Sequence, residues 1–281
     1  MKLGISLPYR NPDNSHLSIK QLMTRAKLIE DIGFDGIWFG DTVGRTANAR
    51  PDTLMWLEAA AAATDHIELG TAVIQVPLRN PVELAVRLMT LHALSGGRFW
   101  AGLGAGSTRK DFDAVGVDFE QRFKLFSAAL PVMRRLCDGE QVGEANLQPW
   151  PSAGKGPPFL IGSWESGIWV RKAAREYDGW MASGRTTLNK MKEGINRFRD
   201  AGGEGKRTLV STIPVDLSQP EAKIDADDVF SLNCGPESAR ERLQMLADLG
   251  YDDALLVRLD HTEAEITADD LRAIRALWPR E

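Results

Sequence analysis

Residues 67–107 hold the pattern that most limits how this chain folds. A β-branched run at 67–74 precedes a helical pattern at 81–94, and a second apolar run at 98–103 opens into a cluster of glycines. A strand, a crossover helix and another strand form a βαβ unit, in which the two strands are parallel. If similar units flank this one, the carboxyl ends of their strands share one face, where a common site is expected.

The remaining sequence repeats this alternation of strand and helix. Strands are predicted at 2–7, 35–39, 67–74, 98–103, 159–162, 179–183, 208–215 and 253–259, and helices at 18–32, 54–63, 81–94, 121–136, 165–177, 187–200, 236–249 and 268–278. The pattern predicts a (β/α)8 TIM barrel, a single domain over residues 1–281 with loop insertions at the C-terminal face of the strands. A doubly wound open sheet is the alternative, because a linear sequence does not show closure.

Two stretches depart from this regular pattern. Residues 108–120 are polar and irregular, so we expect a long loop there, and residues 140–158 are rich in glycine and proline, as in a linker. Pro131 falls inside the predicted helix 121–136, where a proline is expected to kink or restart the helix.

Charge and cysteine usage exclude several classes of protein. The chain has 281 residues and a net charge of −5, without runs of Lys or Arg, so nothing indicates nucleic-acid binding. No span approaches the roughly 20 apolar residues that cross a bilayer, and the first residues do not resemble a signal peptide. Cys137 and Cys234 lie far apart, which favours a reducing cytoplasm. We therefore expect a cytoplasmic protein.

In a (β/α)8 barrel, functional residues follow the C-terminal ends of the strands. This rule selects Tyr9, Arg10, Asp41, Gln75, Gly104 to Ser107, Ser163 to Ser166, Ser183 to Arg185, and Arg258 to His261. Asp41 ends its strand beside a glycine, where it either orients a bound ring or caps a loop. Gly102, Gly104 and Gly106 lack the spacing of a dinucleotide fingerprint. They indicate a backbone that approaches a ligand closely, or a tight turn.

Residues 162–166, Gly-Ser-Trp-Glu-Ser, lead from a predicted strand directly into a predicted helix. Free N–H groups at a helix N-terminus bind anions, and Ser163 and Ser166 add hydroxyl donors. The alternative is that Ser163 is an N-cap. Glu165 brings a negative charge to an anion site unless its side chain turns outward.

The four histidines give no metal site, because His16, His66, His92 and His261 are scattered without ligand spacing. His66 and His92 are interpreted as structural, whereas His16 and His261 lie in predicted top loops as candidate acids or bases. No G-x-S-x-G motif supports acyl transfer.

Several segments, in order along most of the chain, resemble the luciferase-like flavin-dependent oxidoreductases, the bacterial luciferase superfamily. They are KLGISLP, EDIGFDGIWFGD, IELGTAVIQVPLRNPVELA, TLHALSGGRFWAGLGAGS, PFLIGSWES, AAREYDGWMAS and GPESARERLQMLADLGYDDALL. The most specific are LSGGRFWAGLGAGS and the Asp-Gly-Trp at 178–180. Two positions depart from the family: Thr42 stands where relatives often have histidine, and Ser107 where several deazaflavin enzymes have glutamate.

The resemblance implies a (β/α)8 barrel that binds reduced FMN or a deazaflavin, coenzyme F420. It implies a non-prolyl cis peptide at Ala72-Val73, under the cofactor ring, and places the phosphate between the turns at 104–107 and 162–166. Asp41 matches the acidic position of the family. The cofactor-binding residues expected in this way are Asp41, Ala72, Val73, Gln75, Gly104, Gly106, Ser107, Gly162, Ser163 and Ser166.

The main functional hypothesis is an FMNH2-dependent monooxygenase of a small organic substrate, supplied with reduced flavin by a separate flavin reductase. Arg185 and His261 are candidates for substrate contacts, and a homodimer is expected because relatives commonly dimerise. The first alternative is an F420-dependent hydride-transfer oxidoreductase. The second is a flavin-free binding protein on the same barrel.

Overall fold

The computed structural model describes residues 1–6, 9–11, 13, 15–44, 50–147, 150, 152, 154–258 and 267–279. Its strands are β1 Lys2–Ser6, β2 Gly36–Phe39, β3 Glu68–Thr71, β4 Ile74–Gln75, β5 Phe99–Gly104, β6 Phe159–Ser163, β7 Gly179–Ser183, β8 Arg207–Asp216, β9 Leu232–Asn233 and β10 Asp253–Val257. Its α-helices are α1 Ile19–Ile32, α2 Thr53–Ala63, α3 Pro81–Leu94, α4 Arg109–Val115, α5 Arg122–Cys137, α6 Ile168–Glu176, α7 Leu188–Asp200, α8 Pro236–Leu249 and α9 Ala268–Arg275, with 3-10 helices η2 Val76–Leu78 and η3 Phe119–Gln121.

The strands are hydrogen-bonded in the order β10-β1-β2-β3-β5-β6-β7-β8-β9, and β10 also pairs with β8. The pairing of β10 with β1 and with β8 is parallel, as is that of β7 with β8. Because β10 pairs on both sides, the strand order returns to its start. The fold is the predicted (β/α)8 barrel, and the alternative of an open doubly wound sheet is wrong.

Contacts between residues divide the chain into two compact units, each of which is described by itself. The first unit consists of Met1–Trp38 and Leu160–Glu281, and the second of Phe39–Phe159. The expectation of a single domain over the whole chain stays a prediction.

In the first unit, helix α1 shows how local sequence signals fix an element. Ser18 is the N-cap, and its side chain and that of Gln21 form a reciprocal capping box, which satisfies backbone N–H groups that a helix start leaves free. Gly33 ends the helix with a φ of 96°, a left-handed conformation that glycine adopts without steric cost. Leu22, Ala26 and Ile29 are buried on one face of α1. Helix α1 therefore lies where the sequence predicts a helix, at 18–32.

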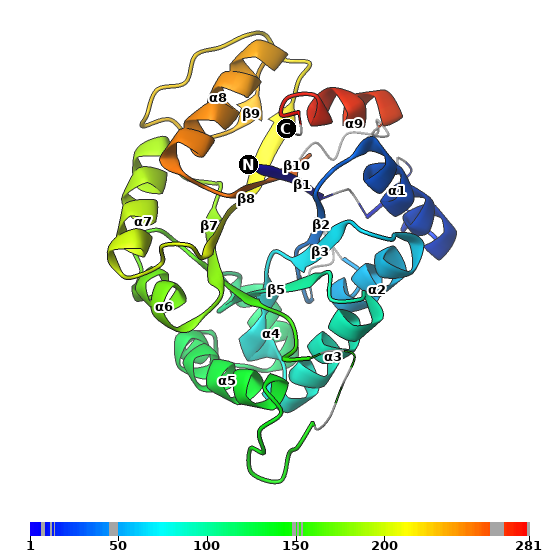
Figure 1. Ribbon diagram of the computed structural model, residues 1–281, viewed down its shortest axis with the longest axis vertical. Coiled ribbons are helices and arrows are strands. Elements are labelled where there is room, and N and C mark those ends of the chain that lie inside the picture. Colours follow the sequence, from blue (N-terminus) through cyan, green and yellow to red (C-terminus); the bar gives the residue numbers. More distant parts are fainter. Residues whose placement is uncertain are drawn as a thin grey trace. The chain divides into compact units, whose positions relative to one another are not determined.

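Helices α6 and α7 of the first unit pack side by side, as Figure 1 shows. Beneath them lies Trp180 of β7, which is fully buried and stacks on Phe198 of α7 with ring centroids 5.9 Å apart. Gly194 of α7 allows this close approach, because a Cβ atom there would lie 2.5 Å from the Trp180 ring. The large aromatic side chain therefore fixes α7 against β7.

In the second unit, Arg98 joins helices α2 and α3 to the adjoining strands. Its guanidinium donates hydrogen bonds to the carbonyl oxygens of Ser95, Ile67, Ala61 and Thr64 and to the Thr64 hydroxyl, at 2.8–3.1 Å. All five N–H donors of an arginine are thus used. Four of the five bonds satisfy carbonyl groups at the ends of helices and strands.

Two predictions about the second unit are corrected. The expected loop at 108–120 contains helix α4 and the short η3 helix. Helix α4 is mostly polar, but Asp111 and Phe112 are fully buried, so two tertiary contacts stabilise a segment whose composition indicates a loop. Pro131 does not restart the helix, because α5 runs continuously from Arg122 to Cys137.

Candidate functional site

The break between β3 and β4 is the first component of the candidate site, within the second unit. The Ala72-Val73 peptide is cis although Val73 is not a proline, which confirms the expectation from the family resemblance. The Ala72 N–H donates to the Phe39 carbonyl at 2.7 Å. Among the described residues, the Val73 N–H has no hydrogen-bond partner, and both residues are half-buried. A small backbone platform with a free donor therefore lies between the two short strands.

A buried ion pair lies at the end of β4. Arg79 donates to both carboxylate oxygens of Asp41, with N–O distances of 2.6 and 2.9 Å, and the backbone N–H of Gln75 donates to the same carboxylate at 3.0 Å. The Asp41 side chain is only 3% exposed, and that of Arg79 is 13% exposed. Burial lowers the pKa of Arg79, but the hydrogen bonds and charge of Asp41 outweigh it and hold the pKa above its ordinary value. Arg79 therefore stays charged.

Gln75 connects this ion pair to helix α4. Its side-chain amide donates to the Asp41 carbonyl at 3.3 Å and to the carboxylate of Asp111 at 2.9 Å. Asp111 is fully buried and Gln75 is 5% exposed. A buried network in which the polar groups are paired holds its elements rigidly. The network of Asp41, Arg79, Gln75 and Asp111 thus fixes the strand that follows the cis peptide.

The turn after β5 is the second component of the candidate site. Gln75 pairs in register with Gly104, which brings this turn beside the end of β4. Gly106 has a φ of 81°, and a Cβ atom there would lie 2.8 Å from both Gln75 Oε1 and the Phe112 ring, so only glycine fits. Within the described chain, the backbone N–H groups of Gly106 and Ser107 have no hydrogen-bond partner.

The free N–H groups of Gly106 and Ser107 suit an anion better than a cation, because they are hydrogen-bond donors. Successive free N–H groups around a left-handed residue form a concave donor site for phosphate oxygens. Ser107 is exposed, and its hydroxyl adds a further donor. The predicted residues Ala72, Val73, Gly104, Gly106 and Ser107 are thus brought together around the ends of β4 and β5.

Asp41 and Gln75 also lie at the end of β4, but their side chains are already hydrogen-bonded within the protein. Asp41 binds Gln75 and Arg79, and Gln75 also binds Asp111. The sequence-based selection missed Arg79 and Asp111. Arg79 lies two residues before the predicted helix 81–94, a position that gave no signal, and Asp111 lies in the segment interpreted as a loop.

The segment after β6 differs from the sequence-based expectation. The predicted helix start at 165 is wrong, because α6 begins at Ile168 with Gly167 as its N-cap. Ser163 is therefore not an N-cap, and its hydroxyl instead accepts a hydrogen bond from Trp180 Nε1 at 3.1 Å. Ser166 is exposed in a turn closed by a hydrogen bond from the Gly167 N–H to the Trp164 carbonyl. The anion-binding role expected of residues 162–166 stays a prediction.

The side chain of Glu165 turns inward. It is 5% exposed, and its Oε1 has no hydrogen-bond partner among the described residues. Burial raises the pKa of Glu165, against the opposing effects of nearby Lys190, Arg197 and Thr186. The expected conflict between this carboxylate and a bound anion is thereby reduced, because the charged form is disfavoured.

Arg185, a candidate substrate contact, is exposed, and its backbone N–H donates to the Ser183 hydroxyl at 3.2 Å. His261, the other candidate, lies outside the described residues. His16 is exposed beside Tyr9, with ring centroids 6.4 Å apart. The role of each of these residues stays a prediction, as does the pairing of the turns at 104–107 and 162–166 around one phosphate.

Thr42 was named from the sequence only as a departure from the family, and Thr212 was not selected at all. The Thr42 hydroxyl is buried without a hydrogen-bond partner in the described part of the chain. Thr212, within β8, has a φ of 62°, which is rare for a β-branched residue and costs conformational energy. The register of β8 against β10 shifts at the same place. No local sequence pattern identifies either feature.

Within the described residues, no group of three or more His, Cys, Asp or Glu side chains is placed to hold a metal ion. A search of the same residues finds no helix long and apolar enough to span a membrane.

Comparison with known proteins places the chain in a family. A family model described as luciferase-like monooxygenase matches residues 1–227. The chain is similar to 4-hydroxyprotoasukamycin monooxygenase of Streptomyces nodosus subsp. asukaensis, with 29% identity over 171 residues, 57% of this chain and 46% of that protein. It is also similar to F420-dependent glucose-6-phosphate dehydrogenase of Kineococcus radiotolerans, with 29% identity over 216 residues, 68% of this chain and 62% of that protein. The matches span about half to three fifths of these relatives.

Solved structures share the fold. The oxygenating constituent of 3,6-diketocamphane monooxygenase from Pseudomonas putida, in complex with FMN, has a TM-score of 0.76 and 15% identity, covering 98% of this chain and 96% of that chain. An F420-dependent secondary alcohol dehydrogenase in complex with an F420-acetone adduct has a TM-score of 0.75 and 18% identity, covering 99% and 98%. With its barrel order, its cis peptide and a family match over most of its length, the chain belongs to the luciferase-like monooxygenase family of flavin- or F420-dependent oxidoreductases.

Proposed function

We propose that this chain is a monooxygenase that uses reduced FMN to oxidise a small organic substrate. The observation that carries the proposal is the pair of free N–H groups at Gly106 and Ser107. They lie in the turn after β5, whose last residue Gly104 pairs with Gln75 of β4, the strand that follows the cis peptide. The relative from Streptomyces nodosus is named a monooxygenase, and the structural neighbour from Pseudomonas putida holds FMN.

The described residues fit such a cofactor by their donor chemistry. The N–H groups of Gly106 and Ser107, with the Ser107 hydroxyl, would hold phosphate oxygens. Ala72 and Val73 would support the ring, and the free Val73 N–H would donate to a ring heteroatom. When bound, the reduced flavin supplies the electrons for oxygen chemistry.

The buried network of Asp41, Arg79, Gln75 and Asp111 has a positioning role in this proposal. Its side chains bind one another, so it acts by fixing the backbone of the platform and of the adjoining turn. Rigid support of this kind keeps binding groups in their productive geometry. Asp41 and Gln75 therefore frame the ring through the backbone that they hold.

An F420-dependent oxidoreductase is the second candidate. The relative from Kineococcus radiotolerans is F420-dependent and aligns with 68% of this chain. A free phosphate-binding turn suits either cofactor, because FMN and F420 both carry phosphate. Ser107, where several deazaflavin enzymes have glutamate, favours FMN.

Anaerobic titration of the protein with reduced FMN, and separately with F420, tests the proposal. We expect saturable binding of reduced FMN, and substrate-dependent oxygen consumption when a separate flavin reductase supplies it. Binding of F420 alone would establish the second candidate, and binding of neither would favour a flavin-free binding protein. A homodimer in the cytoplasm also stays a prediction.

The substitution Ser107→Ala tests the phosphate position. Loss of one hydrogen bond to a charged group should weaken FMN binding by about tenfold. Ser127→Ala, on the exposed side of α5, is the matched control and should leave affinity unchanged. Ser163 is less suitable for this test, because Ser163→Ala would also remove the partner of Trp180 Nε1. Unchanged FMN affinity in Ser107→Ala would show that the phosphate binds elsewhere.

A further inference from the structure

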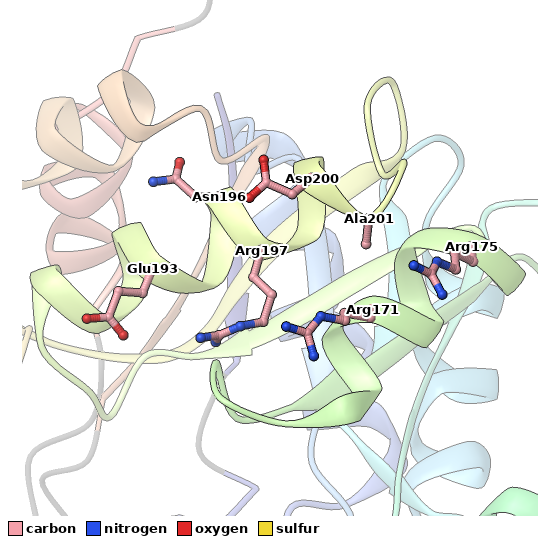
Figure 2. Close-up of a pocket in the computed structure, with 7 residues that line it drawn as sticks. All are labelled: Arg171, Arg175, Glu193, Asn196, Arg197, Asp200 and Ala201. Carbon is pink, nitrogen blue, oxygen red and sulfur yellow. The ribbon is translucent and has the colours of Figure 1, made fainter.

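A groove of about 350 Å³ lies between helices α6 and α7 of the first unit (Figure 2). Its lining residues are Arg171, Arg175, Glu193, Asn196, Arg197, Asp200 and Ala201. Three arginines thus share a small concave surface on a chain whose net charge is −5. The groove belongs to the outer helices and contains none of the residues of the candidate cofactor site.

The two arginines of α6 are available to a ligand. Arg171 and Arg175 are exposed, and neither forms a hydrogen bond or an ion pair with any described residue. They are four residues apart, so both lie on the same face of the helix. Like charges at this spacing destabilise a helix slightly unless an anion lies between them. The arrangement therefore leaves positive charge without a partner at the edge of the groove.

Arg197 of α7 is already held in position. Its guanidinium donates a hydrogen bond to the backbone carbonyl of Glu165, and it forms no ion pair with Glu193 one turn earlier in the described structure. Figure 2 shows Arg197 and Arg171 directed into the space between the helices, while Asp200 and Asn196 extend from the other side of α7. Because the hydrogen bond to Glu165 already restrains the Arg197 side chain, less side-chain entropy is lost when the remaining guanidinium donors bind a ligand.

We propose that this groove binds a phosphomonoester dianion, a small molecule carrying one terminal phosphate group. Guanidinium groups match phosphate oxygens in bidentate geometry, and three arginines from two helices line this groove. A volume of about 350 Å³ is at the lower end of the range for small-molecule sites. The carboxylates of Glu193 and Asp200, which also line the groove, disfavour larger polyanions, such as nucleic acid.

Titration calorimetry with glycerol 2-phosphate, at constant ionic strength, tests the site. We expect saturable binding of one molecule per groove, and an affinity of this site at least about tenfold lower in Arg171→Gln/Arg175→Gln. Arg240→Gln, an exposed arginine of α8, is the matched control and should change the affinity less than about twofold. The exposed positions of both α6 arginines should leave the melting temperature of the double variant unchanged.

Further arms of the experiment distinguish the source of the binding. Ser107→Ala should leave unchanged the part of glycerol 2-phosphate binding that depends on Arg171 and Arg175, because Ser107 belongs to the separate proposed cofactor site. Arg171→Lys/Arg175→Lys keeps the charge but loses the bidentate geometry, and should bind with intermediate affinity.

Inorganic phosphate should compete with glycerol 2-phosphate, whereas chloride at the same ionic strength should not. The proposal would be overturned if the wild type and Arg171→Gln/Arg175→Gln bound glycerol 2-phosphate with equal affinity, or if Arg240→Gln lost as much affinity as the double variant. Binding of an acidic peptide without any binding of glycerol 2-phosphate would also overturn it.

Discussion

Thr212 and Glu165 are two residues whose local conformation or environment is unfavourable. Thr212 is a β-branched residue with a left-handed backbone, and Glu165 is a buried carboxyl group with an unsatisfied oxygen. Strained residues and buried ionisable groups are often found at functional sites, where the surrounding structure maintains them. Both can be tested by their effect on stability, whatever the substrate is.

Thr212→Gly should stabilise the protein. A strained backbone of this kind costs about 1–3 kcal/mol, and glycine removes that cost while losing up to about 1 kcal/mol through the greater entropy of the unfolded chain. The net gain should be about 1 kcal/mol in the free energy of unfolding, measured by urea denaturation.

Thr208→Gly, at a buried position of the same strand where the Thr hydroxyl binds Asp252, should instead destabilise the protein. A loss of stability in Thr212→Gly as large as that in Thr208→Gly would show that position 212 carries no strain.

Glu165→Gln should stabilise the protein more at high pH than at low pH. Burial raises the pKa of Glu165 in the folded state, so the folded state binds more protons than the unfolded state between the unfolded and folded pKa values. The free energy of unfolding of the wild type therefore falls as the pH rises through this window. Below the ordinary glutamate pKa, Glu165 is protonated in both states and the difference disappears.

Urea denaturation at about pH 4 and about pH 8 measures this linkage for the wild type and for Glu165→Gln. The difference in stability between the two proteins should shift in favour of Glu165→Gln at the higher pH. The same difference at both pH values would mean that the pKa of Glu165 is not raised.

At the scale of helices and strands, the sequence predicts regular elements well and tertiary polar contacts poorly. Helix α3 begins where Asn80-Pro81 indicates a helix start. Helix α8 begins at Gly235-Pro236 and ends at Gly250, as these residues indicate. Helix α4 was missed because its burial depends on Gln75, 36 positions away from Asp111. Capping signals lie within a few residues of the helix that they end, whereas a buried hydrogen bond across such a distance leaves no periodic pattern.

The start of α6 was misplaced for a similar reason. The serines at 163 and 166 are typical of an N-cap, but the hydroxyl of Ser163 binds Trp180 and the side chain of Glu165 is buried. Ser163 therefore takes part in a tertiary contact and does not cap the helix, although the local sequence pattern is typical of an N-cap. The cis peptide at Ala72-Val73 was expected from the family resemblance alone, since no periodicity or composition indicates it.

Arg98→Lys should destabilise the second unit. Lysine cannot replace a planar guanidinium that donates five hydrogen bonds, and several carbonyl groups of α2 and β3 would lose their partner. We expect a loss of about 2–4 kcal/mol in the free energy of unfolding.

Arg87→Lys, on the exposed face of α3, is the matched control and should change stability by less than about 0.5 kcal/mol. Similar effects of Arg98→Lys and Arg87→Lys on thermal unfolding would show that the hydrogen bonds of Arg98 contribute little.

At the scale of the whole chain, the alternation of strands and helices predicted the architecture, but closure came from the structure. The pairing of β10 with both β1 and β8 joins residues near the two ends of the chain, and no periodicity encodes it. The candidate site was predicted in part: the turn at 104–107 and the cis peptide were expected, whereas Arg79 and Asp111 were not. Side chains that support a site are selected by packing, which a single sequence does not show.

The central claim is that the backbone N–H groups of Val73, Gly106 and Ser107 hold a flavin cofactor. Hydrogen–deuterium exchange of these amides, measured anaerobically with and without saturating reduced FMN, tests it most directly. New hydrogen bonds to the cofactor should slow exchange at all three amides, while the Arg171 and Arg175 region of α6 stays unchanged. Saturated FMN binding with unchanged exchange at Val73, Gly106 and Ser107 would contradict the claim.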